Sequence, residues 1–215
     1  MTRRVAIDAM GGDRAPGEIV RGAVDAVRQD SALPVLPVGP PDDTRSSLDR
    51  VGPLGGVAGR VDIVPAADVI SMSDSPVEAL RSKRESSIAV ATRLVKGGKA
   101  GAFVSAGNTG VCVAAATLML GRLEGVSRAG IAVVLPAGDG PVVVIDAGAN
   151  INPRPTHLLH YGIMASLYAE GVLGIESPRV GLLNVGEETE KGHDLAKEAH
   201  AHFRRTDLNF VGNVE

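Results

Sequence analysis

The chain alternates short apolar runs with loops of small residues and with segments in which apolar positions recur at helical spacing. Its most marked unit runs from the apolar residues 102–104 through the small residues 105–110 into an apolar, helix-forming run. A similar unit opens the chain, where residues 5–8 lead through the loop 9–13 into a helix that Pro16 begins. A strand, a glycine loop and a helix in this order are typical of an α/β protein.

The same pattern predicts the remaining elements. Apolar runs indicate strands, and the periodic segments between them indicate helices. An Asp-Gly pair between two strong apolar runs predicts a hairpin, so the sheet is expected to be mixed but mostly parallel. The expected strands are 35–38, 61–64, 131–135, 142–146, 180–186 and one that starts at 208, and the expected helices are 42–51, one that Pro76 begins, 88–96, 156–171 and 187–205.

The composition fits a single α/β domain over residues 1–215. Hydrophobic residues make up 44% of the chain, which is ample for a core, but aromatic residues make up only 2%. The core must therefore consist of Val, Leu, Ile and Ala, as in sheets that are buried on both faces. No helix follows the strand that starts at 208, so this domain is expected to be C-terminally incomplete.

Charge and cysteine usage argue against several classes of protein. The net charge is −3 and no basic tract is present, which argues against a nucleic-acid-binding surface. The single cysteine, Cys112, cannot form an intrachain disulfide, and its expected role is core packing in a reducing cytosol. No signal peptide is expected, and the apolar run 111–120 is too short to span a bilayer, which takes about 20 residues. A cytoplasmic protein is therefore expected.

The sequence lacks the common metal, hydrolase and nucleotide motifs. His157 and His160, like His200 and His202, have no nearby cysteine or clustered carboxylates, so no metal site is expected. Neither the G-x-S-x-G elbow nor the P-loop motif occurs, and the first glycine loop does not match the dinucleotide fingerprint.

The loop 105–110 is the central candidate for chemistry. A glycine loop between a strand and a helix exposes backbone N–H groups, and the helix dipole favours an anion there. Its glycines allow close backbone approach, and its polar side chains add donors. These residues are Ser105, Gly107, Asn108, Thr109 and Gly110. The loop is either a site for phosphate or another anionic oxygen, or a tight turn in which Thr109 caps the helix.

Charged residues elsewhere are further candidates. Asp8 in the first loop either contacts a ligand or forms a turn or helix cap. Lys83 and Arg84 form a tight basic pair, which is either a solvated surface or a means of holding an anion. Lys191 is expected in the first turn of the helix 187–205, where a cation opposes the dipole unless an anion is bound. We therefore favour a functional role for Lys191.

Together these motifs resemble one family, the bacterial phosphate acyltransferases, which make acyl phosphate from acyl-acyl carrier protein and inorganic phosphate for phospholipid synthesis. They occur in that family's order and span nearly the whole chain. The matching segments are Asp8-Ala9-Met10-Gly11-Gly12-Asp13, Ser105-Ala106-Gly107-Asn108-Thr109-Gly110, Asp146-Ala147-Gly148-Ala149-Asn150, Gly181-Leu182-Leu183-Asn184-Val185-Gly186-Glu187-Glu188 with Lys191-Gly192, and Asn209-Phe210-Val211-Gly212-Asn213. The chain departs from the family at Asn152, where an acidic residue is usual.

The resemblance implies a three-layer α/β/α sandwich akin to the phosphate acetyltransferases and to the isocitrate and isopropylmalate dehydrogenases. It implies no cofactor and no protein nucleophile, because phosphate itself attacks the thioester. The implied partners are acyl carrier protein, inorganic phosphate and a second copy in a homodimer. Peripheral contact with the membrane, or with a membrane glycerol-phosphate acyltransferase, is also implied.

The resemblance assigns roles to the candidate residues. Lys191 and Asn184 are the candidate catalytic residues, and Asn150 lines the same cleft. Lys83 or Arg84 would guide the acidic carrier. The first loop contributes further substrate-binding candidates, which are Asp8, Gly11 and Gly12.

Three other functions stay open. A phosphate acetyl- or butyryltransferase would use a coenzyme A thioester on the same fold. A metal-dependent decarboxylating dehydrogenase would need a carboxylate cluster and an adenosine site, and the sequence supplies neither. A non-catalytic, membrane-associated scaffold is the third.

Overall fold

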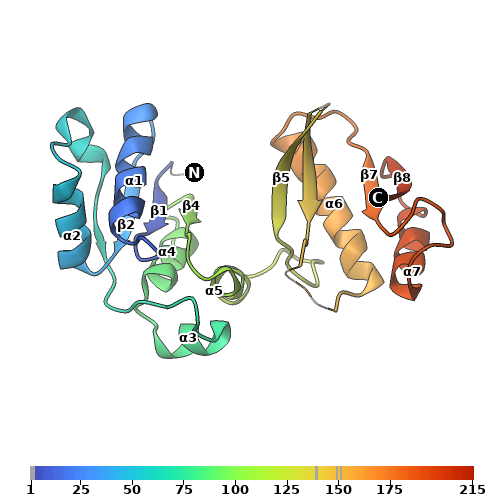
Figure 1. The fold of residues 1–215 in the computed structure, drawn as a ribbon, viewed down its shortest axis with the longest axis horizontal. Coiled ribbons are helices and arrows are strands. Elements are labelled where there is room, and N and C mark those ends of the chain that lie inside the picture. The colour runs from blue at the N-terminus through green and yellow to red at the C-terminus, as the bar shows by residue number, and fades with distance from the viewer. Residues whose placement is uncertain (1–2, 139, 149, 151) are drawn as a thin grey trace. The chain divides into compact units, whose positions relative to one another are not determined.

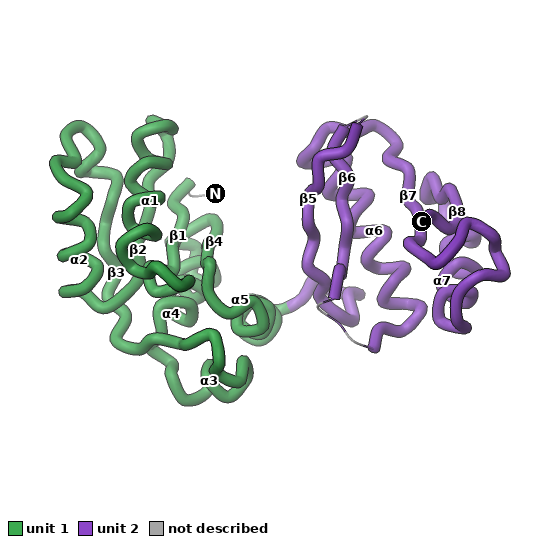
Figure 2. The backbone as a smooth tube through the Cα atoms, viewed as in Figure 1, with its two compact units in different colours: residues 1–121 green, residues 122–215 purple. Residues whose placement is uncertain are grey.

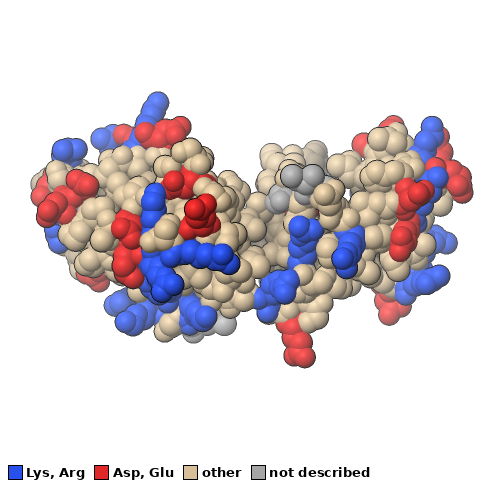
Figure 3. Space-filling view, turned by 90° about the horizontal axis from the view of Figure 1, so that it is seen from below, with Lys and Arg blue, Asp and Glu red and all other residues tan. Residues whose placement is uncertain are grey.

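A computed structural model describes residues 3–138, 140–148, 150 and 152–215. The chain divides into two compact units, unit 1 at residues 1–121 and unit 2 at residues 122–215 (Figure 2). No helix in the described ranges is both long enough and apolar enough to cross a membrane. Both units carry Lys and Arg as well as Asp and Glu side chains on their surfaces (Figure 3).

Unit 1 is built on a parallel four-stranded sheet (Figure 1). Its strands are β1 (Val5–Asp8), β2 (Val35–Gly39), β3 (Val64–Pro65) and β4 (Ala102–Val104), in the order β3-β2-β1-β4. The strand expected at 61–64 is shorter and later than predicted, because Val61 makes only an isolated bridge to Val35 before β3 begins. In the centre, β1 pairs with both β2 and β4, so the loops that follow these strands emerge at one edge of the sheet.

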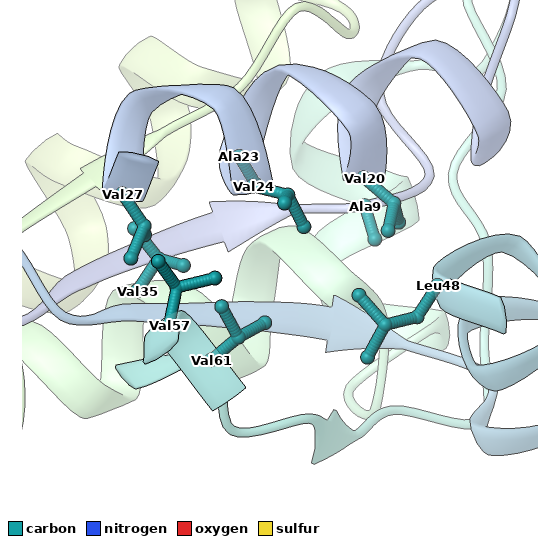
Figure 4. Packing of buried hydrophobic residues seen from close by; sticks show 9 residues of the cluster. All are labelled: Ala9, Val20, Ala23, Val24, Val27, Val35, Leu48, Val57 and Val61. Carbon is teal, nitrogen blue, oxygen red and sulfur yellow. The ribbon is translucent and has the colours of Figure 1, made fainter. Parts of the chain in front are cut away.

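Helices cover both faces of this sheet. They are α1 (Gly17–Gln29), α2 (Pro41–Arg50), the 3₁₀ helix η1 (Gly55–Arg60), α3 (Pro76–Ser82), α4 (Ser87–Lys96), α5 (Thr109–Ala115) and the π-helix η2 (Ala116–Leu120). One apolar cluster joins α1, α2 and η1 to the sheet through residues such as Val24, Val35 and Leu48 (Figure 4). A second joins α4 to the opposite face through Leu36 and Val90. Alternate residues of β2 thus enter opposite cores, which gives unit 1 three layers.

The core lacks aromatic residues on the α1 side, as the composition predicted. Val20, Val24 and Val27 of α1 are fully buried, and they recur at the helical spacing expected for one apolar face. The β-branched valines fit a parallel sheet that is covered on both sides.

Unit 2 contains two small sheets. Its elements are β5 (Ala132–Ala137), β6 (Gly140–Ile145), α6 (Pro155–Gly171), β7 (Val180–Leu183), α7 (Asp194–Phe203) and β8 (Phe210–Val214). The predicted hairpin is confirmed, since β5 and β6 pair antiparallel as a sheet of their own, whereas β7 and β8 pair parallel. A third apolar cluster packs α7 on β7, with Phe203 stacked on Phe210 at a ring-centroid distance of 4.9 Å.

The helix predicted at 187–205 begins later than expected. α7 starts at Asp194, and His193 caps it by accepting a hydrogen bond from the Ala196 N–H. Residues 184–192 form a loop instead, so Lys191 does not lie in a first helical turn. The prediction that Lys191 opposes a helix dipole is therefore wrong. A functional role for Lys191 depends instead on its position in this loop.

Candidate functional site

The two glycine loops of unit 1 interlock at the edge of the sheet. The Ser105 hydroxyl, just beyond β4, lies 2.7 Å from Oδ2 of Asp8, the last residue of β1. Because an ionised carboxylate can only accept hydrogen bonds, the hydroxyl of Ser105 donates to Asp8. The Ser105 oxygen then accepts the Gly107 N–H at 3.0 Å. A directed chain of hydrogen bonds therefore runs from the β4 loop into the β1 strand end.

Asp8 also shapes its own loop. Its other oxygen, Oδ1, accepts the Met10 N–H at 3.1 Å, and its side chain is buried. Of the two roles expected for Asp8, turn formation is the one supported by these contacts. A buried carboxylate between the loops also keeps an anion from binding directly against it, because like charges repel.

The close approach of the loops requires glycine at position 11. A Cβ on Gly11 would lie 2.8 Å from Asp8 Oδ2, 2.8 Å from the Gly107 nitrogen and 2.9 Å from Ser105 Oγ. Gly12 has a φ of +102°, which other residues rarely adopt. The candidates Gly11 and Gly12 are thus needed for the shape of the site.

Asn108, not Thr109, caps α5. Its Oδ1 accepts the Val111 N–H at 3.2 Å, whereas Thr109 is the first residue within the helix. The prediction of a Thr109 cap is wrong because the amide of Asn108 already satisfies this donor. Within the described residues, the N–H groups of Asn108, Thr109 and Gly110 meet no protein acceptor. These three donors remain available to a ligand over the loop.

The Asn108 side chain also ties the segment before α3 to this loop. Its Nδ2 donates to the backbone oxygens of Met72 at 3.0 Å and Asp74 at 3.3 Å. On the same side, a Cβ on Gly110 would lie 2.8 Å from Cγ of Pro76. The segment 72–76 therefore packs directly on the start of α5, which sequence patterns gave no reason to expect.

Lys83 is brought to this segment, and Arg84 is not. Lys83 Nζ lies 2.5 Å from Asp74 Oδ2, which also accepts the Ser71 N–H at 2.8 Å. The hydrogen bond from Lys83, followed by that from Ser71, lowers the pKa of Asp74. Arg84 lies between α3 and α4 and instead donates through Nε to the oxygen of Arg81 at 3.3 Å.

Cys112 lies beneath the same loop. Burial raises the pKa of its thiol; a hydrogen bond with Ser105 acts in the opposite direction, and the negative charge of Asp8 raises the pKa further. The thiol is therefore disfavoured as a thiolate, which suits the packing role predicted for it.

In unit 2, Asn150 belongs to a network at the end of β6. Its Nδ2 donates to Asp146 Oδ1 at 2.9 Å, to the Tyr161 hydroxyl oxygen at 3.0 Å and to the Ala129 oxygen at 3.1 Å. Burial raises the pKa of Tyr161, and the charge of Asp146 raises it further. The candidate Asn150 is thus held by protein groups through its Nδ2.

Asn184 and Lys191 meet in the loop between β7 and α7. Asn184 Nδ2 donates to the Lys191 oxygen at 3.0 Å, and its Oδ1 accepts the Val185 N–H at 2.9 Å. The backbone at Gly192 has a φ of +85° and lies against the Asn184 amide. The exposed Lys191 side chain forms no ion pair with any described carboxylate. Asn184 therefore shapes the loop from which a free ammonium group projects.

Asn213 holds the same loop from β8. Its Nδ2 donates to the Glu188 oxygen at 2.9 Å, and its Oδ1 lies 3.1 Å from Nδ1 of His200. The sequence pattern assigned no role to Asn213. It also gave no role in shaping the loops to Asp74, Tyr161 or His200. A polar residue within the short strand at 208–214 was the available signal for Asn213, which is the one buried residue of β8. Asp74 carried no such signal.

No set of three or more His, Cys, Asp or Glu side chains in the described part of the chain is placed to hold a metal ion. The described site residues thus offer backbone N–H groups, amides and one free lysine. Such donors stabilise negatively charged oxygens.

Comparison with known proteins agrees with this chemistry. The profile of the family described as "Fatty acid synthesis protein" matches residues 3–215. A "Phosphate acyltransferase" of Heliobacterium modesticaldum is 50% identical over 212 residues, which are 99% of this chain and 62% of that protein. The protein of the same name from Clostridium acetobutylicum is 43% identical over 98% of this chain and 63% of its own length. The chain thus spans about 62% of the length of these relatives.

A solved structure has the same fold. A branched-chain phosphotransacylase of Enterococcus faecalis matches with a TM-score of 0.64 and 19% sequence identity, over 99% of this chain and 67% of that one. The predicted α/β fold of the phosphate acetyltransferase kind is thereby confirmed. With a family profile that covers nearly every residue, the chain belongs to the fatty acid synthesis protein family, alongside the phosphate acyltransferases that it resembles in sequence.

Proposed function

We propose that this chain is part of an acyltransferase that converts acyl-acyl carrier protein and inorganic phosphate into acyl phosphate for phospholipid synthesis. Its similarity to curated phosphate acyltransferases supports the reaction class. The observation that carries the proposal is the pair of interlocked loops in unit 1, where three backbone N–H groups at the start of α5 have no acceptor among the described residues. Such a set of donors suits a dianion such as phosphate.

The reaction needs little else from the protein. A phosphate oxygen attacks the thioester carbon, a C–O bond forms, the C–S bond breaks, and the carrier leaves as a thiolate that takes up a proton. The N–H groups of Asn108, Thr109 and Gly110 hold the phosphate or the thioester oxygen. In unit 2, Lys191 is the candidate for stabilising the negative charge of an oxyanion, and Asn184 keeps the Lys191 loop in shape.

The loop residues divide into two roles in this proposal. The Ser105 hydroxyl donates its hydrogen bond to Asp8, so Ser105 fixes the loop and does not contact phosphate. Gly107 likewise uses its N–H on Ser105. The direct contacts are left to Asn108, Thr109 and Gly110, while Gly11 and Gly12 supply room for the loops to meet.

Several finer assignments extend the proposal. The full-length protein acts as a cytoplasmic homodimer with peripheral contact to the membrane or to a membrane glycerol-phosphate acyltransferase. Lys83, held by Asp74 beside the loop, and Asn150 serve as secondary substrate contacts. Arg84 is exposed between α3 and α4, where it guides the acidic carrier protein toward the site.

The decisive experiment measures free carrier thiol released from acyl-acyl carrier protein by the full-length protein. Release must depend on added inorganic phosphate and yield acyl phosphate in equal amount. Acetyl- and butyryl-coenzyme A serve as alternative donors in parallel. Faster turnover with the coenzyme A thioesters would reassign the protein to the phosphate acetyl- or butyryltransferases, and no phosphate-dependent release from any donor would overturn the proposal.

A further inference from the structure

A group of basic side chains surrounds a buried histidine at the start of α6 in unit 2. His157 is buried, and its Nδ1 accepts the Arg154 N–H at 3.0 Å. The neutral ring therefore carries its proton on Nε2, which points its remaining N–H away from the Arg154 backbone. Burial lowers the pKa of His157, and the positive charges of Arg128, Arg154 and His160 lower it further. The imidazole of His157 thus lies in the field of two arginines.

The arginines of this basic cluster lack acidic partners. Arg128 donates one N–H to the Asn152 oxygen at 3.0 Å and is half-buried, while Arg154 is exposed. Neither guanidinium forms an ion pair with a described carboxylate, although Asp146 lies in the same region. Oδ1 of Asp146 is occupied by Asn150.

Arg128 and Arg154 thus bring two guanidinium groups without an ion-pair partner among the described residues to the start of α6. Each arginine has five N–H donors in a planar fork, and Arg128 uses one of them on protein. Forks of this kind match the oxygens of a phosphate group with paired hydrogen bonds. The Nε2–H of His157 adds a neutral donor in the middle of the cluster.

We propose that Arg128, Arg154, His157 and His160 form a phosphate-binding subsite in unit 2. The positive charge comes from side chains on two segments, the loop that contains Arg128 and the first turns of α6. The phosphate is either inorganic phosphate or the phosphodiester of the arm that carries the acyl thioester. The second source rests on the proposed function, whereas the binding of phosphate itself does not.

The test uses NMR of the full-length protein with labelled histidines, titrated with inorganic phosphate against chloride at equal ionic strength. We expect saturable shifts of the His157 ring resonances and an increase in the pKa of His157, because a bound anion favours the imidazolium form. Arg128→Gln and Arg154→Gln are each expected to weaken this response about tenfold or more, since each removes a charged donor. Arg205→Gln, an exposed arginine beyond α7, is the matched control and is expected to leave it unchanged.

The possible results separate this subsite from the proposed function. The amide signals of Thr109 and Gly110 report phosphate at the loop of unit 1, so either site can fail alone. Unmoved His157 signals, or equal shifts in the wild type and both arginine variants, would overturn the subsite. Acyl-acyl carrier protein that displaces phosphate, when carrier protein without its arm does not, identifies the phosphodiester of the arm as the source; otherwise the source is inorganic phosphate. Equal shifts with carrier protein that lacks its arm would instead assign the cluster to carboxylates of the carrier.

Discussion

The Ser105 hydroxyl donates to Asp8 across two loops that are 97 residues apart in the sequence. The pairing of β1 with β4 places the two strand ends side by side, with Ile7 opposite Val104, so the next residue of each strand reaches the other. Asp8 ends β1 and Ser105 directly follows β4, so neither needs a long side chain to make the contact. The hydrogen bond therefore reports that the two glycine loops are correctly assembled.

Removing either partner should destabilise unit 1. Ser105→Ala leaves the Asp8 carboxylate and the Gly107 N–H without their shared partner, and we expect a loss of about 1–3 kcal/mol in the free energy of unfolding. Asp8→Asn should cost a similar amount. Because the residues are in direct contact, the double variant should cost less than the sum, with a coupling of about 1 kcal/mol or more. Urea unfolding followed by circular dichroism measures all four proteins.

A strictly additive double variant would show that the two side chains act independently. In that case the Asp8–Ser105 hydrogen bond would not be what joins the loops. Phosphate titrations of the single variants add a second measurement, since a misaligned loop should bind phosphate more weakly while Lys191 is untouched.

Gly11→Ala should be far more harmful than an ordinary glycine substitution. The added Cβ would lie within 3 Å of Asp8, Ser105 and the Gly107 backbone at once, so the loops must separate. We expect a loss of about 1–3 kcal/mol in the free energy of unfolding, together with loss of phosphate binding at the loop. Gly22→Ala on α1 is the matched control, because a Cβ there meets nothing within 4 Å. The control should gain about 0.5–1 kcal/mol, and an equally stable Gly11 variant would contradict the proposed packing.

Periodicity predicted the sheet of unit 1 well because its pattern is local. Val20, Val24 and Val27 recur at helical spacing, and the apolar strands are bounded by glycine loops. The loops that carry the candidate residues were also found, because small residues between a strand and a helix have few other uses. Their meeting at one edge follows from parallel pairing alone.

The rest depended on contacts that no spacing reveals. Asp74 reaches Asn108 and Lys83 through a loop without periodicity, and Asn213 binds the Glu188 oxygen from another strand. The start of α7 was placed too early because Glu187 and Glu188 are good first-turn residues in isolation. In the structure the preceding loop is held instead by Asn184 and Asn213, so tertiary hydrogen bonds override the local preference.

Acid should release the segment that Asp74 anchors. Lys83 and the Ser71 N–H lower the pKa of Asp74 in the folded state. The ionised carboxylate therefore stabilises the fold above the pKa of the unfolded chain, which is about 4. This contribution is lost as the pH falls through the lower pKa of the folded state. The amide signals of residues 71–75 should therefore shift below about pH 4 in the wild type. Asp74→Asn should show the acid-like spectrum at neutral pH. A wild-type segment that is unchanged down to pH 2 would contradict the anchoring role.

Lys191→Ala should abolish most catalysis and leave the fold intact. The Lys191 side chain is exposed and has no ion pair in the described structure, so its removal disturbs no packing, while its backbone oxygen still accepts the Asn184 amide. Removing a positive charge that stabilises an oxyanion is expected to lower kcat about 100-fold or more. Lys197→Ala on the exposed side of α7 is the control of equal charge and should retain full activity.

Asn184→Ala should lower kcat as well, but through disorder of the loop, so its amide signals at 185–192 should change where those of Lys191→Ala do not. Equal turnover of the Lys191 and Lys197 variants would remove Lys191 from the mechanism and leave the backbone N–H groups of the β4 loop as its whole electrostatic basis.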